Sequence, residues 1–268
     1  MAQETKRFAG NIPENYQRYL VPLLFEPYAR HLLKTLAPIE GGAVLELACG
    51  TGALSGLLRQ HLKDEIRLVS TDVSLDMLEI ANRELGTVAG LELQVADAMD
   101  LPFPNDCFET VICQFGIMVF PNKRRGLTEM FRILKPGGRA YVSVWDDVVH
   151  NEFINTANQT VQALELSEPI NILGGFSYTD IDEIKADFEA AGFESLDISV
   201  VQKTSEAPNI DFAINGVMNG TSLANQLEAQ GLLDTGRTAI YENFNSVFGQ
   251  GRANAQMQAI FCTTSKPL

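Results

Sequence analysis

The sequence predicts an α/β protein with a Rossmann-like, doubly wound, seven-stranded and mostly parallel sheet carrying helical lid insertions. Short apolar runs alternate with segments of helical spacing between residues 43 and 145. The stretch "VLELACGTGALSG" (44–56) reads as a buried strand that enters a glycine-rich turn. Strands that alternate with helices favour a parallel sheet, and such sheets bind ligands at the carboxyl ends of their strands.

The first half of the chain supplies five strands, and helical segments connect most of them. The helix after the second strand begins at Ser74, whose side chain is a good N-cap. "KPGG" (135–138) is predicted to be a turn before the fifth strand. The expected strands are 43–48, 67–73, 91–98, 108–116 and 139–145, and the expected helices are 54–62, 74–85 and 123–134.

The second half is less regular. A helix over 180–193 is expected to end at Gly192, and strands are expected over 194–203 and 255–264. Residues 146–178 show no strong period, and residues 205–253 have mixed helical and loop character. Long insertions at the functional edge of a sheet commonly form lids or pocket walls.

These features predict a single domain over residues 1–268, whose parts differ in role. Residues 1–40 are expected to form an N-terminal helical cap, and residues 41–146 the ligand-binding core. The insertions at 146–178 and 205–253 are expected to form the lid and the substrate region.

Composition excludes several classes of function. The net charge is -14, from 34 acidic and 20 basic residues, so nucleic acid and anionic membranes are unfavourable partners. No apolar run is as long as a membrane span, and the N-terminus lacks the apolar stretch of a signal peptide. The four scattered cysteines favour reduced thiols over disulfides or zinc. We therefore expect a cytoplasmic protein without a metal site, and we leave a homodimer open.

The glycine-rich turn only partly matches a dinucleotide site. Gly50 and Gly52 fit the pattern Gly-x-Gly-x-x-Gly, but Ser55 occupies the third position and Gly56 comes one residue late. Glu46 lies within the preceding strand, and a buried carboxylate needs a partner. A cationic group such as an ammonium would supply one, whereas a pyrophosphate would be repelled.

Two further acids end the next two strands. Asp72 is suited to accept hydrogen bonds from two ribose hydroxyls, which fits NAD and other adenosine ligands equally well. The Asp97 carboxylate is placed to accept a hydrogen bond from the exocyclic amine of adenine. The adjacent amide of Ala98 is placed to meet a ring nitrogen. Met77 either lies on the purine face or packs in the helix core, and the sequence does not decide between these positions.

Four stretches together carry a family resemblance: "VLELACGTG", "STDVSLDML", "ADAMDLPFPNDCFETVICQFG" and "EMFRILKPGGRAYVSVW". They resemble the successive motifs of class I S-adenosylmethionine-dependent methyltransferases, in the branch related to ubiquinone and menaquinone biosynthesis. The resemblance is strong over about residues 40–146. In two places the chain departs from the family pattern: Ala48 stands where the family usually has glycine, and Glu109 replaces an aspartate.

The resemblance implies S-adenosylmethionine as cofactor and a role for each matching residue. Glu46 would face the ammonium of the methionine moiety, and the backbone of Ala48 and Gly50 would contact that moiety. Asp72 would hold the ribose. The remaining cofactor contacts would come from Val73 and Met77 beside the adenine, Asp97 and Ala98 at its edge, Gln114 and Phe115 near the methyl group, and Tyr19 as a cover. For Tyr19 and for Tyr16, plain helix packing is the competing interpretation.

The acceptor and the base are less sharply indicated. Aromatic and methionine side chains near the expected pocket suit a small hydrophobic or ring-containing acceptor, although many of them must be core. The expected substrate pocket consists of Tyr16, Met118, Trp145, Phe176, Tyr178 and Tyr241. A general base is needed only for a protonated acceptor, and His150 is the candidate, with a plain surface histidine as the competing interpretation. The rival functions are an NAD-dependent oxidoreductase and a non-catalytic cofactor-binding module.

Overall fold

The computed structural model describes residues 11–268 as two compact units. Unit 1 comprises the described residues up to Tyr28 together with Asp147–Gly174 and Gln202–Gln258. Unit 2 comprises Ala29–Asp146, Gly175–Val201 and Ala259–Leu268. The strands β6 (Leu196–Ala207) and β7 (Ala253–Ser265) contribute residues to both units.

The sheet confirms the predicted fold class. Its seven strands have the order β3-β2-β1-β4-β5-β7-β6. All strand pairs among the first five strands are parallel, and β7 runs antiparallel to β5. The first five strands are β1 (Ala43–Leu47), β2 (Arg67–Asp72), β3 (Leu91–Val95), β4 (Phe108–Gln114) and β5 (Leu134–Trp145).

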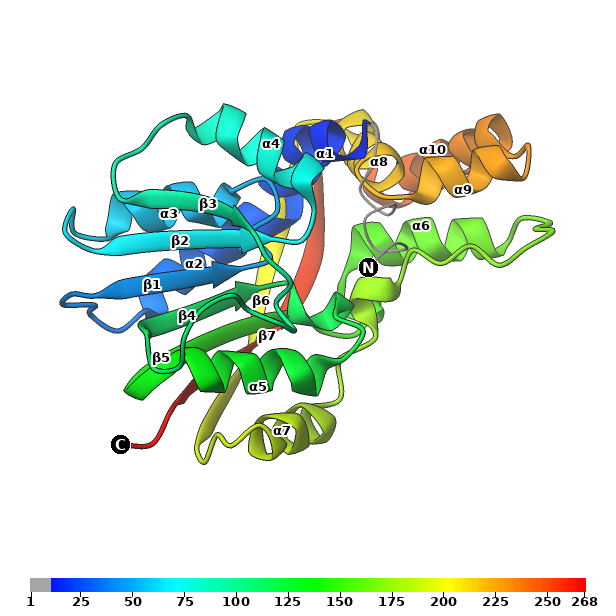
Figure 1. Cartoon of the computed structure of the whole chain (residues 1–268). Helices are drawn as coiled ribbons and strands as arrows, with labels where there is room; N and C mark the ends of the chain where they lie inside the picture. The colour runs from blue at the N-terminus through cyan, green and yellow to red at the C-terminus, as the bar shows by residue number, and fades with distance from the viewer. Residues whose placement is uncertain (1–10) are drawn as a thin grey trace. The chain divides into compact units, whose positions relative to one another are not determined.

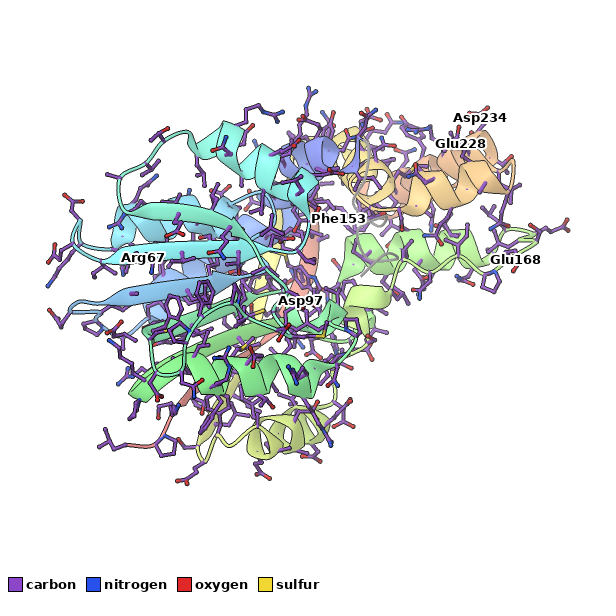
Figure 2. All side chains as sticks on the ribbon, in the orientation of Figure 1. Arg67, Asp97, Phe153, Glu168, Glu228 and Asp234 are labelled. Atoms are coloured by element: carbon purple, nitrogen blue, oxygen red, sulfur yellow. The ribbon has the colours of Figure 1, made fainter. Side chains whose placement is uncertain are left out.

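The strand order reverses beside β1, whose two neighbours are β2 and β4. Figure 1 shows these parallel arrows pointing the same way, so their carboxyl ends share one edge. In open α/β sheets this switch point is where ligands bind. Figure 2 places Arg67 at the start of β2 and Asp97 beyond the end of β3, at opposite edges of the sheet.

The predicted turn at 135–138 is wrong, because these residues belong to β5. Phe108 pairs with Leu134, whereas Thr110 pairs with Arg139, so β5 holds extra residues against β4. The glycines permit this irregularity, since Gly137 has a φ of 78°. The Lys-Pro-Gly-Gly sequence therefore bulges a strand rather than ending one.

The helices of unit 2 cover the sheet, and a capping residue marks the start of α4. Figure 1 shows α5 in front of the sheet and α3 behind it. Ser74 accepts a hydrogen bond from the amide of Met77, which confirms the predicted cap. The helices are α3 (Ala53–His61), α4 (Leu75–Leu85), α5 (Lys123–Ile133) and α7 (Ile181–Ala190), with short 3₁₀ turns η2 (Ile117–Val119) and η4 (Gly174–Phe176).

Gly52 and Gly56 allow α4 to approach the turn and α3 closely. A Cβ on either residue would lie 2.8 Å from a methyl group of Leu85. Both glycines are therefore explained by helix packing, one of the roles that a glycine fingerprint serves.

Unit 1 is mainly helical. The chain begins with α1 (Ile12–Asn15), a π-helical segment η1 (Tyr16–Phe25) that contains Pro22, and α2 (Glu26–Thr35), which continues into unit 2. Proline cannot donate the regular helical hydrogen bond, which accounts for an irregular helix there. The other elements are η3 (Val148–His150), α6 (Glu152–Gln162), α8 (Ile210–Asn219), α9 (Leu223–Ala229) and α10 (Leu233–Phe248).

The expectation of no strong period over 146–178 is wrong for α6. Its buried residues recur at helical spacing, namely Phe153, Ile154, Ala157, Thr160 and Val161. Threonine and alanine occupy two of these positions, which weakens the apolar signal. Phe153, labelled in Figure 2, stacks on Phe244 of α10 with ring centroids 5.8 Å apart. Across residues 11–268, no helix is both long and apolar enough to span a bilayer.

Candidate active site

Glu46 lies at the centre of the candidate site, inside β1 and only 2% exposed. Its Oε2 accepts hydrogen bonds from the hydroxyls of Ser55 at 2.5 Å and Ser70 at 2.7 Å. Burial, with a smaller contribution from Asp72, raises the pKa of Glu46 to about 7 against the lowering effect of both hydroxyls. The predicted buried carboxylate is therefore present, and the residues that hold it are serines.

The turn after β1 is built from residues in the left-handed conformation. Ala48, Gly50 and Gly52 have φ values of 52°, 56° and 81°. For Ala48 this conformation costs about 1–2 kcal/mol relative to a right-handed residue. Glycine adopts it freely, which explains why the family pattern favours glycine there. A Cβ built on Gly50 would have no atom within 4 Å, so open space lies over this residue.

Asp72 ties the end of β2 to the same turn. Its Oδ2 accepts a hydrogen bond from the Gly50 amide and its Oδ1 accepts one from the Ser74 amide, both at 2.8 Å. Burial raises the pKa of Asp72, while these amides lower it. A carboxylate oxygen has two acceptor sites, so both oxygens keep capacity for ligand hydroxyls.

The residues expected around the adenine follow β2 and β3. Asp97 is half-buried and accepts a hydrogen bond from the Met99 amide at 2.8 Å. Ala98 is buried beside it, and Val73 is half-buried after β2. Met77 is buried within α4, which agrees with the helix-core position. Asp97 and Ala98 follow β3 just as Asp72 ends the adjacent strand β2.

An aromatic stack follows β4 and β5. Phe115, at a φ of 56°, stacks on Trp145 with ring centroids 4.0 Å apart, and Trp145 also stacks with Phe176 at a centroid distance of 5.8 Å. Met118 is buried, and its methyl group would lie 3.4 Å from a Cβ on Gly175, beside Phe176. Unit 2 thus brings together four residues that the sequence placed near the reacting groups or in the substrate pocket.

Three side-chain oxygens in this region are buried without a hydrogen-bond partner among the described residues: Thr51 Oγ1, Gln114 Oε1 and Ser143 Oγ. Thr51 lies in the turn, and Gln114 pairs with Ser143 at the carboxyl ends of β4 and β5. Unsatisfied buried oxygens are uncommon and often mark a site where a ligand or water binds. Thr51, Ser55 and Ser70 were not among the site residues predicted from the sequence. Ser70 is the partner of Glu46 in the pairing of β1 with β2, and Ser55 reaches Glu46 from α3.

Tyr178, an expected pocket residue, is buried with its hydroxyl engaged. Its hydroxyl donates to Asp187 Oδ2 at 3.0 Å, and Asp187 also pairs with Arg124 of α5. Burial, together with Asp187, raises its pKa. Because this contact engages the hydroxyl in the packing of α5 against α7, we do not carry Tyr178 into the proposed substrate site.

Four expected site residues belong to unit 1. Tyr16 packs on Phe25 and Tyr19 on Phe212, each with ring centroids 5.0 Å apart. His150 is exposed at the end of η3. Tyr241 is 43% exposed on α10.

The described residues 11–268 contain no group of three or more His, Cys, Asp or Glu side chains arranged to hold a metal ion. All four cysteines have free thiols, and burial raises the pKa of each. Glu109, the other departure from the family pattern, lies half-buried in β4 and accepts a hydrogen bond from the Ala43 amide at 2.5 Å. It also forms an ion pair with Lys135, so its contacts join β4 to the neighbouring strands β1 and β5.

Residues 25–162, just over half of the chain, match the model of the ubiE/COQ5 methyltransferase family. A demethylmenaquinone methyltransferase from Clavibacter sepedonicus is 39% identical over 109 residues, which cover 41% of this chain and 43% of that protein. One from Staphylococcus carnosus is 26% identical over 209 residues, covering 70% of this chain and 84% of that protein.

A solved structure of a putative methyltransferase from Bacillus halodurans superposes with a TM-score of 0.60 at 20% identity. The superposition covers 90% of this chain and 99% of that one, and it shows that the two share a fold. The chain spans about half the length of several curated relatives, including 43% of the Clavibacter protein and 51% of a Stenotrophomonas maltophilia relative.

Proposed function

Because the chain belongs to the ubiE/COQ5 methyltransferase family, we propose that it transfers a methyl group from S-adenosylmethionine to a small organic acceptor by in-line displacement. The observation that carries this proposal is the set of three carboxylates, Glu46, Asp72 and Asp97, at or near the carboxyl ends of three adjacent strands. Within residues 11–268, no lysine or arginine forms an ion pair with any of them.

These three carboxylates accept hydrogen bonds, so they fit a ligand with an ammonium group, a ribose and an adenine but no phosphate. Anions near these carboxylates would be repelled, which disfavours a dinucleotide. The open space over Gly50 and the unpartnered Thr51 hydroxyl also leave room and hydrogen-bonding capacity beside the turn. The family match likewise supports a methyltransferase rather than the NAD-dependent alternative.

When bound, S-adenosylmethionine would supply a methyl group on a positively charged sulfur. Glu46 would hold the ammonium group, Asp72 would accept hydrogen bonds from the ribose hydroxyls, and Asp97 with Ala98 would contact the adenine edge. Gln114 and Phe115 would lie beside the reacting groups. The role of the protein is then mainly to hold two reactants close and collinear, which is sufficient for a large rate enhancement.

We further propose that the acceptor is a planar, quinone-like molecule in its reduced form. Two relatives are named as demethylmenaquinone methyltransferases, and Phe176, the half-buried member of the Phe115–Trp145–Phe176 stack, offers a flat apolar ring. Met118 of unit 2 would add to these contacts. The roles expected for Tyr16, Tyr19 and Tyr241 stay predictions. His150 remains the candidate base for an acceptor that arrives protonated.

The decisive experiment has two steps. Calorimetry should show binding of S-adenosylhomocysteine and no binding of NAD. Incubation with methyl-labelled S-adenosylmethionine and 1,4-dihydroxynaphthalene should then move label into the organic product. Cofactor binding without transfer to any of a panel of quinols, phenols and amines would favour the non-catalytic binding module instead.

The remaining proposals concern partners and location. The acidic charge supports a small-molecule partner over nucleic acid. We predict a cytoplasmic location, which cell fractionation would test. A homodimer also stays a prediction, and light scattering on a sizing column would test it.

A further inference from the structure

Glu46 is surrounded by hydroxyls and acids and by no positive charge. From α3 it receives the Ser55 hydroxyl, and from β2 it receives the Ser70 hydroxyl and the field of Asp72. The turn contributes Cys49 and β4 contributes Cys113, and burial keeps both thiols neutral at physiological pH by raising their pKa values. Among residues 11–268, no lysine, arginine or histidine forms an ion pair with Glu46.

Two buried carboxylates without a counter-cation are costly when both are ionised. Asp72 is the better anion, because two backbone amides donate to it and both are fixed by the fold. Glu46 has only hydroxyl donors, which it can keep in either protonation state, since a neutral carboxyl group still accepts hydrogen bonds. The proton that relieves the repulsion therefore belongs on Glu46.

We propose that Glu46 carries a proton in the free protein near neutral pH and releases it to solvent when the ammonium group of the cofactor binds. The O–H bond of the Glu46 carboxyl group breaks, the proton passes to buffer, and the resulting carboxylate pairs with the ammonium. This inference rests on the proposed function, because it takes the cofactor to be an amino-acid-bearing nucleoside.

Ser55 and Ser70 act as positioning residues in this step. Their hydroxyls hold Oε2 in place and stabilise the anion, so they set the pH at which Glu46 ionises. Ser55 occupies the position that a third glycine would take in a dinucleotide fingerprint, and here its side chain has a use that glycine does not provide.

The test is the pH dependence of S-adenosylhomocysteine binding, measured by calorimetry between pH 5.5 and 7.5. With a pKa near 7 for free Glu46, affinity should fall about 25-fold from pH 7.5 to pH 5.5, because more protein must lose a proton to bind. At pH 6.5, titrations in two buffers of different ionisation enthalpy should show release of about three quarters of a proton. Glu46→Gln should bind more weakly and release almost no proton.

The serine variants test positioning. Ser55→Ala and Ser70→Ala should each move the midpoint of the pH profile upward by on the order of one unit, since the anion loses a donor. Ser55→Thr and Ser70→Thr should restore the midpoint. Thr128→Ala, which removes an exposed hydroxyl on α5, should leave the profile unchanged. A purely structural role would lower the melting temperature without moving the midpoint.

The outcomes separate the two proposals. Binding of S-adenosylhomocysteine with a flat pH profile and no proton release overturns the proton step and leaves the proposed function standing. A pH profile in Glu46→Gln as steep as that of the wild type also overturns it. No binding at any pH overturns the proposed function and this inference together.

Discussion

The carboxylate of Asp72 and the backbone amide of Gly50 form a 2.8 Å hydrogen bond that joins the end of β2 to the turn after β1. The other carboxylate oxygen accepts from the Ser74 amide at the start of α4. One side chain therefore fixes two segments that border the proposed cofactor site. Its removal should affect binding and stability together.

Asp72→Ala should weaken S-adenosylhomocysteine binding by about 1.5–3 kcal/mol, the range for hydrogen bonds to a charged group. It should also lower the free energy of unfolding by about 1–3 kcal/mol, because two amides lose their acceptor. Calorimetry and urea unfolding measure the two effects. Asp64→Ala, an exposed loop aspartate, is the control and should change neither. Normal binding by Asp72→Ala would show that Asp72 is not the ribose ligand.

Ala48→Gly should raise the free energy of unfolding by about 0.5–1 kcal/mol. The left-handed conformation of Ala48 costs about 1–2 kcal/mol, and glycine would remove this cost. Glycine also has greater backbone freedom in the unfolded chain, which offsets part of the stabilisation. Urea unfolding measures the change. Ala53→Gly, in the first turn of α3, is the matched control and should destabilise. Destabilisation by Ala48→Gly as well would mean that the Ala48 methyl group makes packing contacts worth more than the strain.

The candidate residues that the sequence indicated lie within short local motifs. Glu46, Gly50 and Asp72 follow from strands and turns that a local pattern identifies. Ser55 and Ser70 did not, because they reach Glu46 only through the packing of α3 and the pairing of Glu46 with Ser70 between β1 and β2. The strain at Ala48 and Phe115 was also invisible, since side-chain identity does not report a positive φ.

The aromatic residues show the same limit. Trp145 and Phe176 were expected near the acceptor, and they do stack in unit 2, through a contact across 31 positions of sequence. Tyr178, only two residues later, packs toward Asp187 instead. A list of aromatics from composition cannot separate such neighbours, because the direction of each side chain depends on the turn that precedes it.

Gly116→Ala should lower the free energy of unfolding by about 1–3 kcal/mol through overpacking. The new Cβ would lie 2.5 Å from the Cβ of Ala48 and 2.9 Å from Cys113 Sγ. Adding Ala48→Gly should restore part of the loss, and a double-mutant cycle in urea measures this coupling. Strictly additive effects would show that the ends of β1 and β4 relax independently.

Cofactor binding should not require a metal ion. The proposed ligands are carboxylates and backbone groups, and residues 11–268 hold no cluster with metal-binding geometry. Calorimetry with S-adenosylhomocysteine should give the same dissociation constant with and without EDTA. A loss of affinity in EDTA that magnesium or zinc restores would contradict this.

The last prediction separates acceptor binding from cofactor binding. Phe176 ends the aromatic stack in unit 2, and Tyr241 presents a 43% exposed ring on α10 of unit 1. Phe176→Ala and Tyr241→Ala should each raise the Michaelis constant for the acceptor roughly fivefold, which corresponds to an aromatic contact of about 1 kcal/mol. The dissociation constant of S-adenosylhomocysteine should barely change. Tyr178→Phe is the control, because its hydroxyl serves Asp187, so it should lower stability and leave the Michaelis constant alone. If both alanine variants lose the cofactor and keep acceptor binding, the insertions belong to the cofactor site, and the acceptor must bind elsewhere.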